Sequence, residues 1–144
     1  MRLTAFTDFG FRALMRIASE PDRAFSTAEI ADEFGISRHH LTKTMAVLAN
    51  AGFLTTRRGA GGGAMLARPA GQIGLGAVVR VLEREQALVE CFRADGGACV
   101  ITPECRLKHA FAEAEEAFLA RLDGYTLADC ALAPRARPFA EAPS

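Results

Sequence analysis

The chain has 144 residues, of which 50% are hydrophobic and 24% are charged, with equal numbers of basic and acidic side chains. This is the size and composition of one globular domain that can bury a core. Charged residues interrupt the apolar N-terminus, and no apolar run approaches the ~18 residues that a membrane span needs. We therefore expect no signal peptide and no membrane segment, and we expect a cytoplasmic protein.

The charges are divided unevenly along the chain. Residues 1–80 carry ten basic and six acidic side chains, whereas residues 81–144 carry seven and eleven. A basic half beside an acidic half is typical of a polyanion-binding module joined to a sensing or dimerising module. The same difference also arises from ordinary surface variation, so it supports this organisation only weakly.

Three helices are predicted in the first fifty residues. Apolar residues recur at helical spacing from about Thr4 to Ser19. Ser26 and Glu29 form a capping box that opens a short helix, and this helix ends at Gly35. Another helix is expected over residues 38–51. Two helices joined by a tight turn that contains glycine are a helix-turn-helix.

The second helix of this motif has one apolar face, formed by Leu41, Met45 and Leu48. Polar residues near its N-terminal end lie off that face, where a recognition helix normally meets base edges. These candidate DNA-binding residues are Arg38, His39, Thr42 and Lys43.

A glycine-rich β-hairpin is predicted directly after the helix-turn-helix. Residues 53–58 and 64–68 have strand character, and the turn between them contains four glycines in five residues. Such a wing lets the backbone approach a phosphate and leaves Arg57, Arg58 and Gly59 free to contact DNA. The competing interpretation, a nucleotide-binding loop, lacks the Gly-Lys-Ser/Thr motif and a helix directly after the glycines.

Three cysteines follow in one short stretch. Seven residues separate Cys91 from Cys99, and five separate Cys99 from Cys105. These gaps are wider than the usual spacing of paired zinc ligands, so a larger iron–sulphur centre fits better than zinc. Disulfides are the alternative, but thiols in the cytoplasm stay reduced. Cys130 stands apart and is interpreted as a structural or incidental thiol.

A long helix is predicted after the cysteine stretch. Thr102 and Pro103 have the pattern of an N-cap and first helical residue, which places Cys105 in the first turn. The positive end of the helix dipole favours a metal-binding thiolate there. One side of this helix is apolar and is expected to pair with a second subunit. Its apolar residues are Leu107, Phe111, Ala114, Phe118 and Leu122.

These segments resemble the bacterial family of winged-helix iron–sulphur regulators that includes IscR, NsrR and RirA. The resemblance covers roughly residues 1–130, through MRLTAFTDFGFRAL, SRHHLTK, RGAGGGAMLARPA and the cysteine stretch. The segments FTDFG, LVECF, CVITPECRLKHAF and DGYTLAD are most similar to the NsrR type, which represses transcription and responds to nitric oxide.

The resemblance implies a ligand set for the cluster. Cys91, Cys99 and Cys105 match the family's cluster cysteines, and Asp8 of the partner subunit stands where NsrR-like members supply a carboxylate. On its own, Asp8 is also typical of a favourable charge at a helix N-terminus. The histidine of IscR-like members would stand three positions after the third cysteine, where this chain has Lys108. The implied cofactor is a [4Fe-4S] cluster, or alternatively a [2Fe-2S] cluster, which aerobic isolation can remove.

The resemblance further implies a homodimer that binds a palindromic double-stranded DNA operator and releases it when nitric oxide reacts with the cluster. Arg58 would enter the flanking minor groove. The alternative within the family is a RirA- or IscR-like regulator that responds to iron or cluster supply. A thiol redox switch or enzyme is the alternative of another class, and the chain lacks the CxxC pair typical of one. We therefore expect no enzymatic activity.

The expected fold is mainly α with a small β-hairpin wing, as a winged helix-turn-helix plus a long dimerisation helix. Residues 1–80 would form the DNA-binding domain, with a C-terminal helix that also packs on it. Residues 81–104 would form the cluster-binding loop and residues 105–132 the dimerisation helix and a short C-terminal helix. Residues 133–144 would be a disordered tail.

Overall fold

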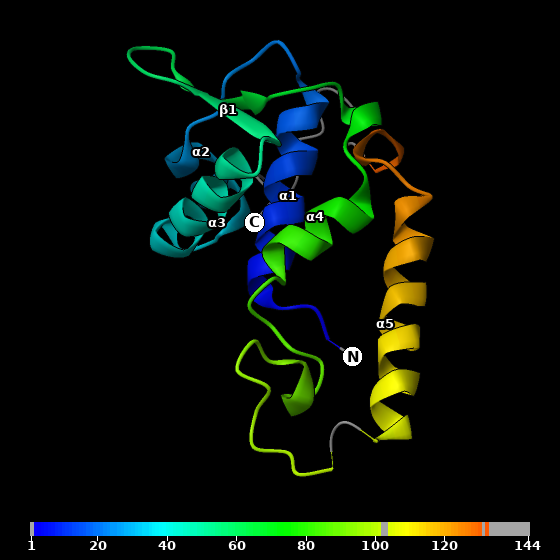
Figure 1. Cartoon of the computed structure of the whole chain (residues 1–144). Helices are drawn as coiled ribbons and strands as arrows, with labels where there is room; N and C mark the ends of the chain where they lie inside the picture. Colours follow the sequence, from blue (N-terminus) through cyan, green and yellow to red (C-terminus); the bar gives the residue numbers. More distant parts are fainter. Residues whose placement is uncertain (1, 102–103, 131, 133–144) are drawn as a thin grey trace, which may run out of the picture.

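The computed structural model describes residues 2–101, 104–130 and 132. It is mainly helical with one two-stranded antiparallel hairpin, which confirms the predicted fold class. Figure 1 shows α1 at the centre, with the helix-turn-helix and hairpin on one side and the last helix on the other. The helices and strands are α1 (Ala5–Ser19), α2 (Thr27–Phe34), α3 (Arg38–Asn50), β1 (Leu54–Arg57), β2 (Gly63–Leu66), α4 (Leu75–Leu82) and α5 (Arg106–Asp123).

The predicted helix starts are found within one or two residues. Thr4 caps α1, Ser26 caps α2 and Ser37 caps α3, each by accepting a backbone N–H bond three residues on. The capping box at α2 is only half formed. Ser26 accepts from the Glu29 amide at 3.1 Å, whereas the Glu29 carboxylate forms an ion pair with Arg23. The ion pair with Arg23 therefore replaces the bond from Glu29 to the N-cap backbone that the sequence pattern predicts.

The core lies where α1 crosses α3 and α4. Large apolar side chains from these helices are fully buried, and Phe25 joins them from the loop before α2. Helix α4 was not predicted as a separate element, yet its Val78 and Val79 are buried in this core. A short 3-10 turn at Leu127–Asp129 returns to the same core, where Leu127 is completely buried. Burial of these apolar surfaces is the main stabilisation of the fold.

Helix α5 extends away from this core (Figure 1). None of its residues is buried, and Leu107 and Phe111 near its start are exposed. Its far end lies against α4, where Arg80 donates to both oxygens of Asp123 at 2.7 and 2.9 Å. Within the described residues, no helix has the length and apolar character to cross a membrane.

The beginning of α5 differs from the sequence prediction. The helix starts at Arg106, and Cys105 is its N-cap residue, so the thiol stands one position before the helix instead of within its first turn. The Cys105 side chain makes no capping bond. The predicted capping residues Thr102 and Pro103 lie outside the described residues.

Candidate functional site

The predicted recognition helix presents its polar side to solvent. Leu41, Met45 and Leu48 of α3 are buried, as the apolar pattern predicts. The four candidate DNA-binding residues of this helix are all exposed. The Arg38 guanidinium is held by Asp32 of α2 at 3.1 Å, and the Thr42 hydroxyl donates to the Arg38 carbonyl at 2.7 Å. The remaining two residues, His39 and Lys43, lie in the first two turns of α3.

The predicted wing is a tight hairpin that projects past α2 and α3 (Figure 1). Its register pairs Leu54 with Leu66 and Arg57 with Gly63. Arg57 ends the first strand, Arg58 and Gly59 begin the connecting loop, and all three are exposed. The loop cannot accept larger residues at Gly62, since a Cβ atom there would lie 2.2 Å from the Arg57 carbonyl oxygen. The glycines therefore make the narrow tip that carries the two arginines.

The wing is joined to the loop before α2 by backbone hydrogen bonds. Phe25 donates to the Ala64 carbonyl at 2.9 Å and accepts from the Ala64 amide at 2.7 Å. A Cβ atom at Gly63 would lie 2.4 Å from the Phe25 carbonyl oxygen, so glycine is needed for this close approach. The hairpin thus rests on a residue whose ring is buried in the core.

The three candidate cluster cysteines lie on the segment between α4 and α5. Cys91 belongs to a short 3-10 turn, Cys99 follows in an irregular loop and Cys105 precedes α5. Each is a free thiol of intermediate exposure. The Glu90 carboxylate accepts from the Ala98 amide at 2.9 Å, so the chain folds back on itself between these two residues.

The chemistry of this donor set fits an iron–sulphur cluster, because such clusters are held by cysteine thiolates. Their arrangement is open, since within the described residues no three His, Cys, Asp or Glu side chains are grouped closely enough to hold a metal ion. Asp8 lies in the first turn of α1, where its exposed carboxylate forms an ion pair with Arg12 at 2.9 Å. Its role as a ligand from a partner subunit stays a prediction.

Two sets of polar contacts were not predicted from the sequence. The Glu83 carboxylate, at the end of α4, accepts from the Thr4 amide and hydroxyl at 2.8 Å each and from the Thr7 hydroxyl. It therefore fixes the start of α1. Burial alone would raise the pKa of Glu83, but the hydrogen bonds from Thr7 and Thr4 lower it below its ordinary value. The second set surrounds Arg16, a basic residue on the buried side of α1.

A family model described as Rrf2, an iron-dependent transcriptional regulator, matches residues 3–132 of this chain. The chain belongs to the Rrf2 family. Its structure is similar to that of CymR, the global cysteine regulator of B. subtilis, with 26% identity, a TM-score of 0.71, and coverage of 91% of this chain and 96% of that chain. It is also similar to T. potens IscR, with 27% identity, a TM-score of 0.70, and coverage of 90% and 85%.

Membership of the Rrf2 family fixes the general function. The chain is a transcriptional regulator that binds DNA through a winged helix, and the prediction that it is not an enzyme is confirmed by the family. The family includes iron–sulphur members such as IscR and also the cysteine regulator CymR. The signal that this Rrf2 protein detects must therefore be argued from its own residues.

Proposed function

We propose that this Rrf2 regulator is a dimeric iron–sulphur repressor that releases its operators in response to nitric oxide. The observation that carries this proposal is the set of three free, half-exposed thiols at Cys91, Cys99 and Cys105. They are gathered on one segment between the DNA-binding core and α5. Thiolates in this number favour an iron–sulphur centre over a structural disulfide.

Asp8 of the partner subunit is proposed as the fourth ligand. Its carboxylate is exposed at the first turn of α1, and its pairing with the equally accessible Arg12 is a surface contact that contributes little. A bound cluster would supply iron that reacts with nitric oxide, and the Asp8 carboxylate would hold that iron less tightly than a cysteine thiolate does. Asp8 and the cysteines would join the two chains, so loss of the Asp8 ligand would release α1 from the partner subunit.

Helix α5 supports the dimer. Leu107 is 61% exposed, and Val100 and Ile101 just before the helix are 93% and 65% exposed. Apolar side chains at this level of exposure are costly in a monomer, and a second copy of the same helix would cover them. A two-fold dimer would place two copies of α3 in successive major grooves, which requires a palindromic operator with half-sites about 10 base pairs apart.

The proposed contacts with DNA follow from exposure. Arg38, His39, Thr42 and Lys43 would reach base edges or phosphates in the major groove, and Arg58 would enter the flanking minor groove beside Arg57 and Gly59. Asp32 holds Arg38 in an exposed ion pair, and DNA phosphates would compete for this arginine.

The test combines native mass spectrometry with operator binding. Protein purified without oxygen is weighed before and after stoichiometric nitric oxide, and its affinity for operator DNA is measured in the same samples. We expect the mass of one [4Fe-4S] cluster per subunit, which converts to nitrosyl adducts as DNA is released. Cys99→Ser should lose the cluster, whereas the matched Cys130→Ser should keep it because Cys130 lies outside the ligand set.

A regulator of iron or cluster supply is the second candidate. The similarity to T. potens IscR over most of both chains favours it. A cluster that is present but leaves operator affinity unchanged on exposure to nitric oxide would select this candidate. Protein that binds DNA with no iron at all would refute both.

A further inference from the structure

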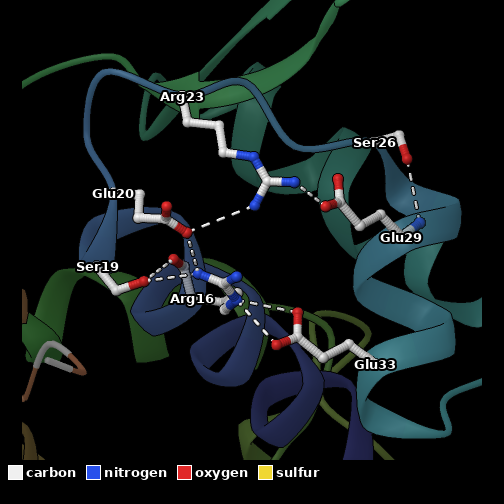
Figure 2. A network of polar contacts seen from close by, with 7 residues as sticks. All are labelled: Arg16, Ser19, Glu20, Arg23, Ser26, Glu29 and Glu33. Carbon is white, nitrogen blue, oxygen red and sulfur yellow. Dashed lines mark hydrogen bonds and ion pairs between the residues drawn. The ribbon is translucent and has the colours of Figure 1, made fainter. Parts of the chain in front are cut away.

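Arg16 lies at the centre of a polar network that connects three elements (Figure 2). It is only 7% exposed, although arginine is rarely buried unless it is paired. Its Nε atom donates to both carboxylate oxygens of Glu33 on α2, at 3.0 and 2.9 Å. Its Nη1 atom donates to Glu20 at 2.7 Å and to the Ser19 hydroxyl at 2.9 Å. These contacts join α1 to the first helix of the helix-turn-helix.

The same guanidinium lies over the ring of Phe25, with its central carbon 4.7 Å from the ring centroid. Arg23 also lies over this ring, at 4.2 Å, and continues the network through ion pairs with Glu20 and Glu29. Phe25 is the residue whose backbone pairs with Ala64 of the wing. Arg16 therefore contacts, directly, both the helix that precedes the recognition helix and the residue on which the wing rests.

We propose that Arg16 is a positioning residue for DNA binding, which fixes the wing relative to the recognition helix by holding Glu33 and the Phe25 ring at once. This inference rests on the proposed DNA contacts of α3 and the wing, and it is independent of the cluster and of nitric oxide. A DNA reader that uses both a helix and a hairpin needs their spacing to match the distance between adjacent grooves. Along the chain the two elements are joined by the short segment between Asn50 and Leu54, and β1 also packs on α3. The contacts of Arg16 add a further connection through the core, which restricts the relative movement of the two elements.

Arginine suits this position for geometric reasons. Its planar group carries donors on its edges and stacks on an aromatic ring with its face, whereas the lysine amine is a compact charge that cannot do both. Glu33 is also largely buried, with 12% of its side chain exposed. Removing one charge from such a pair is costly because its partner stays buried without compensation.

The hydrogen bonds between Arg16 and Glu20 stabilise the charged forms of both side chains. Burial alone would lower the pKa of Arg16, but its hydrogen bonds with Glu20 and Glu33 raise it above its ordinary value. The bond from Arg16 likewise lowers the pKa of Glu20. Arg16 therefore keeps the charge on which its bonds to α2 depend.

The test compares two variants of the network with a control. Arg16→Lys retains the charge but loses the planar group, and Glu33→Gln leaves Arg16 paired with Glu20, so it is the variant that keeps the fold most securely. The control is Val78→Ala, which removes buried core volume in α4 away from the network. All are full-length, cluster-loaded proteins, assayed at a temperature where thermal unfolding shows each to be folded.

The probe is the operator that the wild-type protein selects from a pool of randomised duplexes. We expect Glu33→Gln and Arg16→Lys to lower operator affinity about tenfold or more, with affinity for random-sequence DNA changed less than about twofold. Hydroxyl-radical footprints should lose protection in the flanking minor groove and keep it in the major groove. Val78→Ala should retain both the affinity and the full footprint.

A double-variant comparison separates positioning from general destabilisation. If Arg16 acts by placing the wing, then Arg16→Lys should cost little further affinity in a protein that already carries Arg58→Ala. Fully additive losses, or network variants that bind like Val78→Ala, would overturn the inference. A protein that binds the operator but ignores nitric oxide would refute the function proposed above and leave this test intact.

Discussion

The same substitution, glycine to alanine, should have different effects on stability at two positions near the start of α4. Gly76 is buried in α4, and a Cβ atom there would lie 1.9 Å from Asp123 Oδ1 and 2.8 Å from the Leu119 carbonyl oxygen, both on α5. Gly74 is the N-cap residue of the same helix, with φ of −74°, and a Cβ atom there would meet nothing within 4 Å. Gly76 thus tests how closely α5 packs on α4.

The expected change in the free energy of unfolding for Gly76→Ala follows from two opposing effects. Alanine gains up to about 1 kcal/mol over glycine from helix propensity, and less in the first turn, where Gly76 lies. Overpacking of a tight contact typically costs about 1–3 kcal/mol, and here the carbonyl of Leu119 belongs to backbone that cannot rotate away. Asp123 would also be pushed from its two bonds with Arg80, which adds to the cost. We expect Gly76→Ala to lower the free energy of unfolding by about 1–2 kcal/mol.

Thermal unfolding followed by circular dichroism measures this change. The expected loss corresponds to a Tm lower by about 3–8 °C in a domain of this size. Protein concentration must be held fixed, because the stability of a dimer depends on it. Gly74→Ala should change the free energy of unfolding by less than about 1 kcal/mol, because the restriction of the unfolded chain by alanine offsets its poorer fit as an N-cap residue. A Gly76→Ala protein as stable as the wild type would refute the close packing of α5 on α4.

Three further predictions concern other contacts. Glu83→Gln should lower the free energy of unfolding by about 1–3 kcal/mol at pH 7. The folded-state pKa of Glu83 lies below its unfolded value. The stability difference between wild type and variant is therefore present above about pH 4.5 and shrinks as the pH falls through the folded-state pKa. Urea unfolding at several pH values checks it, and a difference independent of pH would contradict it. Gly63→Ala should weaken operator binding, because Gly63 has a φ of 146° and its Cβ atom would press against the Phe25 carbonyl. Gly61→Ala should weaken operator binding less, because a Cβ atom at Gly61 would have no neighbour within 4 Å. Ser26→Ala should cost about 1 kcal/mol of stability through loss of the α2 cap, measured by thermal unfolding.

The parts of the fold that depend on local signals could be predicted from the sequence. Ser26 caps the helix that it was expected to cap, and Gly35 ends α2 in the left-handed conformation with φ of 65°. The glycine cluster between two short strands predicted the wing. These signals act over three to five residues, so neighbouring sequence is sufficient to recognise them.

Contacts between distant residues could not be predicted in the same way. Helix α4 is only eight residues long, and its short apolar run fits a buried strand as well as a helix. The Glu83 bonds to Thr4 and Thr7 span more than seventy residues. The partner of Arg16 on α2 is seventeen residues away, and the sequence offers several acidic residues in that range. Packing selects among these partners.

In the candidate site, too, local patterns could be predicted from the sequence and the arrangement of distant residues could not. The candidate DNA-binding residues of α3 were predicted from helical periodicity, and all of them are exposed. The cysteines were found from their number and spacing, but the segment that carries them has little regular structure from Arg93 to Ile101. No periodic pattern can therefore specify how the three thiols are arranged. The metal itself would supply the constraint that brings such ligands together.

Helix α1 connects these separate features. Asp8 lies in its first turn, the bonds from Thr4 and Thr7 to Glu83 hold that turn to the end of α4, and Arg16 lies two turns further along. At about 1.5 Å per residue the helix is about 22 Å long, and its buried side packs along α3 and α4, so it moves as one rigid body if it moves at all. A displacement at the Asp8 end would therefore reach α2 and the wing through Arg16. If nitric oxide releases the operator as proposed, Glu33→Gln should weaken that effect as well as the operator affinity itself, because Glu33 and Arg16 connect α1 to α2.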